Sequence, residues 1–173
     1  MNIRERYNIE ETLYSFSFNP QKPSVNQSWW FLAGITTGVI ALLLFFNDLG
    51  EEMRWVIGTF LAYFLIHFLY DIQIASKIRF TLDARSNAVY KTSPLLSKKK
   101  IMNLDEAITF VQSEMGSWHY ALGAKKSQFI KSYRISEGFS SGRKSDERQD
   151  AYENFILVKI GKLQENVNSN RNN

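Results

Sequence analysis

The sequence predicts a membrane α-hairpin joined to a small antiparallel β-barrel or roll, with one helix near the C-terminus. Two apolar, uncharged spans, residues 29–46 and 55–70, follow each other within the first 70 residues. Apolar and polar residues then alternate in short runs between residues 78 and 135, which is the period of strands. From residue 145 the apolar spacing becomes helical.

Each apolar span is close to the length that crosses a bilayer, because ~18 residues at 1.5 Å per residue cover ~27 Å. Trp29, Trp30 and Trp55 are placed to anchor the spans at the membrane interface. The alternative is a pair of buried core helices, which is unusual for uncharged spans in so short a chain. We therefore expect the lipid bilayer as a partner of this chain.

Four parts follow along the chain. Residues 1–28 form an N-terminal arm, 29–72 a two-helix transmembrane hairpin, 73–165 a β-rich domain and 166–173 a polar, disordered tail. The 28 mostly polar residues before the first span exclude a secretory signal peptide at this position.

The charges that flank the spans predict their orientation. The connecting loop, residues 47–54, carries Asp48, Glu51 and Glu52 against Arg54, whereas the arm and the segment after the second span are rich in Lys and Arg. Basic flanks stay on the cytoplasmic side of a membrane. We expect a two-pass protein of the bacterial inner membrane with both termini and the β-rich domain in the cytoplasm.

Composition excludes several kinds of chemistry. The chain has 173 residues, a net charge of +4, no cysteine and two histidines, so disulfides, thiolate sites and multi-histidine metal centres are excluded. Neither a phosphate-binding glycine loop nor a nucleophile elbow is present. We expect no enzymatic activity, no metal and no cofactor.

The arm contains a strand-like run at residues 13–18, in which aromatic residues alternate with serines. A lone strand is unstable in water. We expect it either to pair with the C-terminal domain or to lie on the membrane surface.

Alternation in the domain predicts strands at 78–82, 88–92, 100–103, 107–112, 118–122 and 129–135. Turn residues about every 10 positions favour a small barrel. The predicted core consists of Phe80, Leu82, Val89, Ile108, Phe110, Trp118, Tyr120, Phe129 and Ile135.

Residues 146–162 carry apolar side chains at helical spacing, with acidic residues first and lysines last. The β-branched run 155–158 leaves a strand open as the alternative.

Small residues occur at helical spacing in both spans: Gly34 and Gly38 in the first, and Gly58 and Ala62 in the second. Such pairs let helix backbones approach closely. They indicate either self-association of the chain or packing of the two spans against each other, and both can hold. A homo-oligomer is therefore expected.

Aromatic residues and cations cluster near the end of the domain and are the candidate ligand-binding residues: Trp118, Tyr120, Lys125, Lys126, Tyr133 and Arg134. Stacking faces with cations suit a nucleotide. The alternative is an aromatic core with solvated lysines. A second basic run, Lys98, Lys99 and Lys100, is interpreted as an anionic-lipid contact, a phosphate contact or a solvated turn.

The apolar hairpin followed directly by short strands resembles the antiphage effectors of bacterial cyclic-oligonucleotide signalling (CD-NTase-associated proteins) that combine two transmembrane helices with a minimal β-barrel. This resemblance implies that the barrel binds a cyclic nucleotide, rather than a nucleic acid polymer, and that the protein oligomerises and disrupts the inner membrane.

The paired spans, the strands and the terminal helix also resemble bacterial membrane proteins with a pleckstrin-homology-like domain. That second resemblance implies a scaffold or lipid-binding accessory protein without toxic activity. A membrane-bound immunity or secretion accessory protein is a third possibility.

Overall fold

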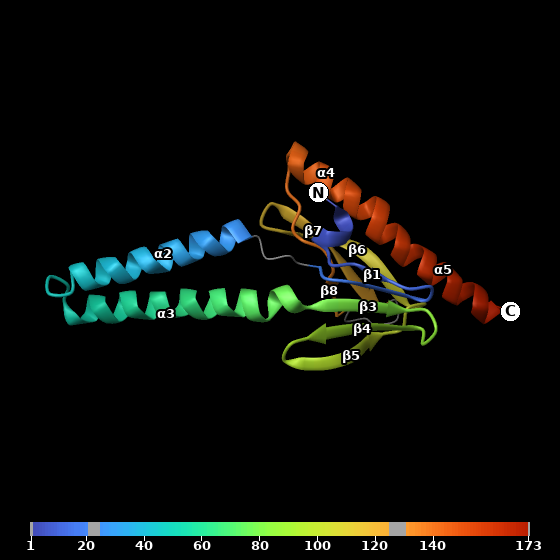
Figure 1. Cartoon of the computed structure of the whole chain (residues 1–173), viewed down its shortest axis with the longest axis horizontal. Coiled ribbons are helices and arrows are strands. Elements are labelled where there is room, and N and C mark those ends of the chain that lie inside the picture. Colours follow the sequence, from blue (N-terminus) through green and yellow to red (C-terminus); the bar gives the residue numbers. More distant parts are fainter. Residues whose placement is uncertain (1, 21–24, 125–130, 173) are drawn as a thin grey trace. The chain divides into compact units, whose positions relative to one another are not determined.

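The computed structural model describes residues 2–20, 25–124 and 131–172, which form two compact units (Figure 1). One unit contains Met1–Lys22 together with Lys77–Asn173, and the other is the helical unit Pro23–Ser76. The N-terminal arm therefore belongs to the same unit as the C-terminal domain, from which it is separated in sequence by the helical unit.

The helical unit consists of α2 (Val25–Leu44) and α3 (Glu51–Gln73), which pack against each other. Helix α3 begins after Gly50, and Glu51 and Glu52 lie in its first turn, where carboxylates complement the helix dipole. The connection between the two helices is therefore residues 45–50, whereas the sequence predicted 47–54. Arg54 supports the turn, since its Nε donates to the Leu49 carbonyl at 2.9 Å and its guanidinium lies 4.1 Å from the centre of the Phe46 ring.

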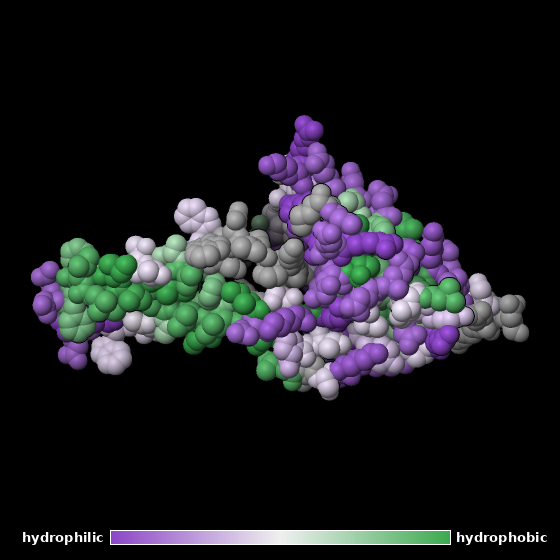
Figure 2. All heavy atoms as spheres, in the orientation of Figure 1, coloured by the Kyte–Doolittle hydropathy of each residue, from purple (hydrophilic) through white to green (hydrophobic). Residues whose placement is uncertain are grey.

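One helix in the described part of the chain is long and apolar enough to cross a membrane. It spans Glu51–Lys77, and none of its apolar window is buried. The apolar stretch of α2, Trp30–Leu44, is shorter than the length that crosses a bilayer at ~1.5 Å per residue. A pair of crossing helices is thus not confirmed. Figure 2 shows the apolar side chains of these helices at the surface.

The first sheet has five antiparallel strands in chain order: β1 (Glu10–Glu11), β2 (Ser15–Phe18), β3 (Arg79–Asp83), β4 (Ala88–Ser93) and β5 (Leu96–Met102). Strand β2 pairs with β3, so that Phe18 lies opposite Phe80. The strand of the arm thus completes the sheet of the domain, which decides between the two alternatives left by the sequence.

The second sheet contains β6 (Ala107–Glu114), β7 (Ser117–Ala124) and β8 (Tyr133–Arg134). Met115 and Gly116 form a tight turn with positive φ angles of 44° and 77°. The described strands form two antiparallel sheets; of the predicted barrel or roll, a closed barrel is not observed among them. Between β5 and β6, the amides of Leu104 and Asp105 donate to Asn87 Oδ1 at 3.0 Å, which ties this connection to the β3–β4 turn.

A nearly continuous helix closes the sheet unit. It comprises α4 (Arg143–Tyr152), a π-helical turn (Glu153–Leu157) and α5 (Val158–Asn172). The helix predicted from spacing is therefore confirmed over the strand alternative. It also continues through the residues expected to be disordered, because Val167 extends the buried face that holds Ile160 and Leu163. A short helix, α1 (Ile3–Arg6), begins the arm, and a 3₁₀ turn (Ala75–Lys77) precedes β3.

Most predicted core positions that the structure describes are buried: Phe80, Leu82, Val89, Tyr120 and Ile135, with Trp118 packed at the margin. Phe129 lies outside the described residues. The prediction was wrong for Ile108 and Phe110, which are only partly buried and stand outside the core cluster.

The register explains the error at these two positions. Phe110 lies opposite Ala121, and Val111 lies opposite Tyr120. Directly opposed residues share a face of a sheet, so Phe110 is on the face away from Tyr120.

Candidate functional site

The first two predicted ligand residues, Trp118 and Tyr120 on β7, face the C-terminal helix. Trp118 Nε1 donates to Gln149 Oε1 at 2.9 Å, and the Tyr120 hydroxyl donates to the Glu153 carboxylate. The Tyr120 ring is buried and stacks on Tyr152 with ring centres 5.6 Å apart. Both side chains are therefore engaged in holding the helix on the sheet.

The remaining described members divide between the two faces of the sheet, and Tyr133 shares the face of Tyr120 whereas Arg134 does not. Arg134 is opposite Ala121, and Tyr133 is opposite Leu122, so neighbouring residues of β8 point to opposite faces. The Arg134 guanidinium turns back and donates from Nε to the Ser136 carbonyl at 3.0 Å. Lys125 and Lys126 lie outside the described residues. The described members of the predicted set do not converge on one pocket.

Titration shifts in this region have structural causes. Burial and the hydrogen bond to Glu153 raise the pKa of Tyr120 to about 12. Hydrogen bonds from Tyr120 and Gln149 lower the pKa of Glu153. Burial and the nearby Arg134 lower the pKa of His119. Near pH 7, Tyr120 and His119 are therefore neutral and Glu153 is ionised. The neutral Tyr120 hydroxyl can thus donate to the Glu153 carboxylate and hold the helix on the sheet.

The strongest concentration of charge lies at the outer edge of the five-stranded sheet. We call it the basic edge and define it by Lys91 on β4 and Lys98, Lys99 and Lys100 on β5. Strand β5 is the edge strand, and its three lysines are exposed. Lys91 lies directly opposite Lys99. Like charges in opposed positions destabilise a sheet, so an anion bound here would relieve their repulsion.

Aromatic rings lie within the basic edge. The Lys98 ammonium is 4.3 Å from the centre of the Tyr90 ring, and the Lys91 ammonium is 5.8 Å from that of Tyr133. The cation near Tyr133 is thus Lys91, which is not a member of the predicted ligand-binding set. Sequence reasoning missed Lys91 because the pairing of β4 with β5 was not deduced.

The β4–β5 turn, next to the basic edge, lies at the end of the sheet where β2 ends and β3 begins. Strand β2 ends at Phe18 and β3 begins at Arg79, which lies opposite Thr92 near the end of β4. The turn that follows, Pro94 and Leu95, is at this same end, and the Leu95 side chain is 72% exposed. A leucine in a turn beside a row of lysines combines an apolar tip with a cationic surface.

The glycines of the helical unit divide into two groups. A Cβ on Gly38 would come within 2.7 Å of Leu61 Cδ2, so this glycine lies at the contact between α2 and α3. A Cβ on Gly34 or Gly58 would meet no other atom within 4 Å, and Ala62 is exposed. Within the described residues, one predicted small position thus serves the contact of the two helices, and the others leave open surface.

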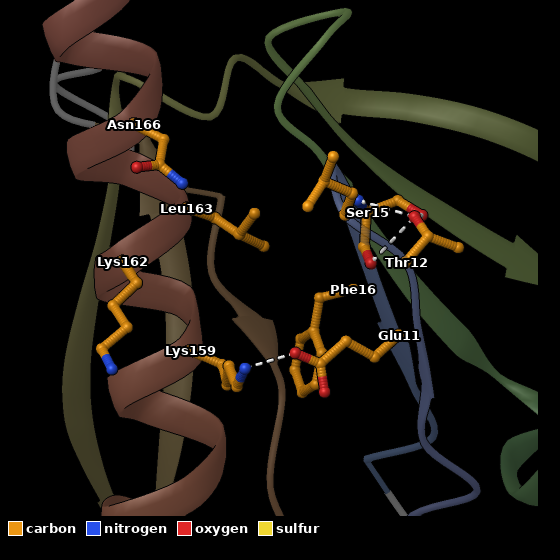
Figure 3. Close-up of a pocket in the computed structure, with 9 residues that line it drawn as sticks. Glu11, Thr12, Ser15, Phe16, Lys159, Lys162, Leu163 and Asn166 are labelled. Atoms are coloured by element: carbon orange, nitrogen blue, oxygen red, sulfur yellow. Dashed lines mark hydrogen bonds and ion pairs between the residues drawn. The ribbon is translucent and has the colours of Figure 1, made fainter.

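A hollow occurs on the surface between the β1–β2 turn and α5 (Figure 3). Its volume is about 150 Å³, and it is lined by Glu11, Thr12, Phe16, Lys159, Lys162 and Leu163, among others. It lies at the end of β2 away from Phe18.

The fold and the basic edge define a class of domain: two antiparallel sheets with a C-terminal helix, which carry an apolar helical unit between two paired strands. Comparisons of the chain with models of protein families, with characterised proteins and with solved structures found no match.

Proposed function

We propose that the chain is a membrane-anchored scaffold module whose basic edge binds anionic lipid headgroups. The observation that carries this proposal is the direct opposition of Lys91 and Lys99, flanked by Lys98 and Lys100, on an edge strand. Because opposed like charges weaken strand pairing, the Lys91–Lys99 pair supports a role in anion binding rather than in stability.

The energies favour a membrane surface. Each lysine held near an anionic leaflet contributes ~1 kcal/mol, so the two lysines on one face of the basic edge, Lys91 and Lys99, supply about 2 kcal/mol. Insertion of the exposed Leu95 side chain into the interface adds roughly 1–2 kcal/mol. These terms are weak for a free protein but sufficient for a domain that its own helices already hold at the bilayer.

The anchoring part of the proposal rests on the helical unit. Helix α3 has the length and polarity of a crossing helix. We propose that α2 completes a two-pass hairpin, and the basic flanks favour both termini in the bacterial cytoplasm. The basic edge then belongs to the leaflet that is rich in anionic lipid. The two-sheet domain with its C-terminal helix supports the resemblance to pleckstrin-homology-like modules.

A single-cysteine probe tests the lipid contact in the full chain, which has no natural cysteine. Leu95→Cys is labelled with a polarity-sensitive dye and reconstituted in nanodiscs of phosphatidylcholine with or without 30% phosphatidylglycerol. We expect a blue shift of the dye only with the anionic lipid. The same probe at Leu13, at the other end of the sheet, should show none.

Charge reversal provides the matched control. Lys98→Glu/Lys99→Glu should abolish the blue shift, whereas Arg143→Glu/Lys144→Glu reverses two exposed charges at the start of α4 and should preserve it. A Leu95 probe that does not respond to phosphatidylglycerol, or responds equally in both double variants, would refute lipid binding at the basic edge.

A second candidate function is the antiphage effector, in which a cyclic nucleotide bound by the sheet domain drives assembly of the helical units and breaches the inner membrane. The open surface at Gly34 and Gly58 favours it, since small residues without an intramolecular partner are available to a second copy. Lys91 near Tyr133 supplies the cation and ring that a nucleotide needs.

A further inference from the structure

The β1–β2 turn, residues 12–15, presents apolar side chains to solvent. Leu13 is 80% exposed and Tyr14 is 41% exposed. Strand β2 runs from this turn to Phe18, so the turn lies at the end of the sheet opposite to Leu95. Neither side chain belongs to the core cluster.

Hydrogen bonds fix the shape of this turn. The Thr12 amide donates to the Ser15 carbonyl at 2.8 Å, and the Ser15 amide donates to Thr12 Oγ1 at 3.0 Å. The Ala84 amide donates to the Tyr14 carbonyl at 2.8 Å, and the Arg85 guanidinium covers the Tyr14 ring at 4.0 Å. Leu13 is therefore held outward on a preorganised loop, which lowers the entropic cost of binding.

A hollow lies on each side of Leu13. The first, about 150 Å³, separates the turn from α5, and Figure 3 shows Lys159 reaching across it to Glu11. The second, about 450 Å³, is lined by Tyr14, Asp83 and Arg85. Leu13 lines both, so an extended segment that crosses the turn fills both hollows.

The charges around these hollows are unevenly balanced. The carboxylates are engaged: Glu11 pairs with Lys159, and Asp83 Oδ1 accepts the Arg85 amide at 2.9 Å. Lys162, beside the first hollow, and Arg85, beside the second, make no ion pair with any residue that the structure describes. The excess charge is thus positive beside the first hollow, whereas the Asp83 carboxylate and the Arg85 guanidinium balance each other beside the second.

We propose that this surface binds an extended acidic segment of another protein, with a carboxylate near Lys162 and an apolar side chain against Leu13. Lys162 provides the charge complementarity, and Leu13 provides the apolar contact. The two hollows on either side of Leu13 fit an extended peptide segment. This inference does not depend on lipid binding at the basic edge.

A peptide of stated sequence tests the surface directly. The full chain is reconstituted in nanodiscs of phosphatidylcholine alone, and fluorescein-labelled Glu-Leu-Glu-Leu-Glu-Leu is titrated by fluorescence anisotropy. We expect saturable binding, and we expect weaker binding of Glu-Ser-Glu-Ser-Glu-Ser and none of Lys-Leu-Lys-Leu-Lys-Leu. Lys162→Glu should weaken binding about tenfold, because an attraction becomes a repulsion. Leu13→Ser should weaken it about fivefold.

Lys144→Glu, an equal charge change at an exposed lysine at the start of α4, is the matched control and should leave the dissociation constant unchanged. The proposal is overturned if the peptide does not bind, or if Lys144→Glu weakens binding as much as Lys162→Glu does. It is also overturned if a dye at Leu13→Cys shifts on anionic nanodiscs, since the surface would then face lipid. A silent Leu95 probe with intact peptide binding would refute the lipid proposal alone.

Discussion

Glu137, in the segment between β8 and α4, accepts hydrogen bonds from three side chains. Its carboxylate binds Arg6 at 2.7 Å, the Tyr7 hydroxyl at 2.8 Å and Arg148 at 3.3 Å. The Glu137 side chain is 20% exposed, so solvent screens these contacts only in part. This one residue joins the N-terminal arm to the last helix, although 131 positions separate it from Arg6.

Glu137→Gln keeps the size of the side chain and removes its charge. We expect it to lower the stability of the sheet unit by about 1–3 kcal/mol, because charge-assisted hydrogen bonds become neutral ones. Near-ultraviolet circular dichroism of the full chain in detergent should show Tm lower by roughly 4–10 °C. Glu147→Gln, which removes the exposed pair with Arg143, is the control and should change Tm little. Equal Tm values for both variants would contradict this role of Glu137.

At the scale of elements, local periodicity located most strands and the terminal helix. Phe80 and Leu82 alternate with polar neighbours, and β3 contains both. Periodicity did not reveal which strands pair, so the place of β2 beside β3 and the Lys91–Lys99 opposition could not be deduced. The predicted ligand set failed to converge for the same reason, since register decides the face on which Arg134 lies.

The end of α5 is helical and docked on the core, although its polar sequence predicted a disordered tail. Residues 166–172 are polar except for Val167, which is 7% exposed and packs in the core. We expect Val167→Ala to lower the stability by about 1–2 kcal/mol through lost burial, and Asn168→Ala, its exposed neighbour, to change it little. Thermal unfolding of the two variants distinguishes a docked helix from a disordered tail, for which both substitutions would be silent.

For the whole molecule, the question is whether the helical unit acts alone or in an assembly. Gly38 lies against Leu61 within the unit, whereas Gly34 and Gly58 have no atom near their Cβ positions. An anchor requires only the first contact. An effector that breaches a membrane requires the open positions, because helices of separate copies must approach there.

Substitution at the two glycines of α2 separates these possibilities. If copies assemble through the open surface, Gly34→Leu should abolish the oligomers that chemical crosslinking detects in cell membranes, since a bulky side chain holds the helices apart. Gly38→Leu should instead force Leu61 to move and disturb the hairpin. Dye entry into cells that co-express a cyclic-nucleotide synthase should then require Gly34. If the wild type forms no oligomer and admits no dye, the effector function is refuted, and the lipid-binding anchor accounts for the chain.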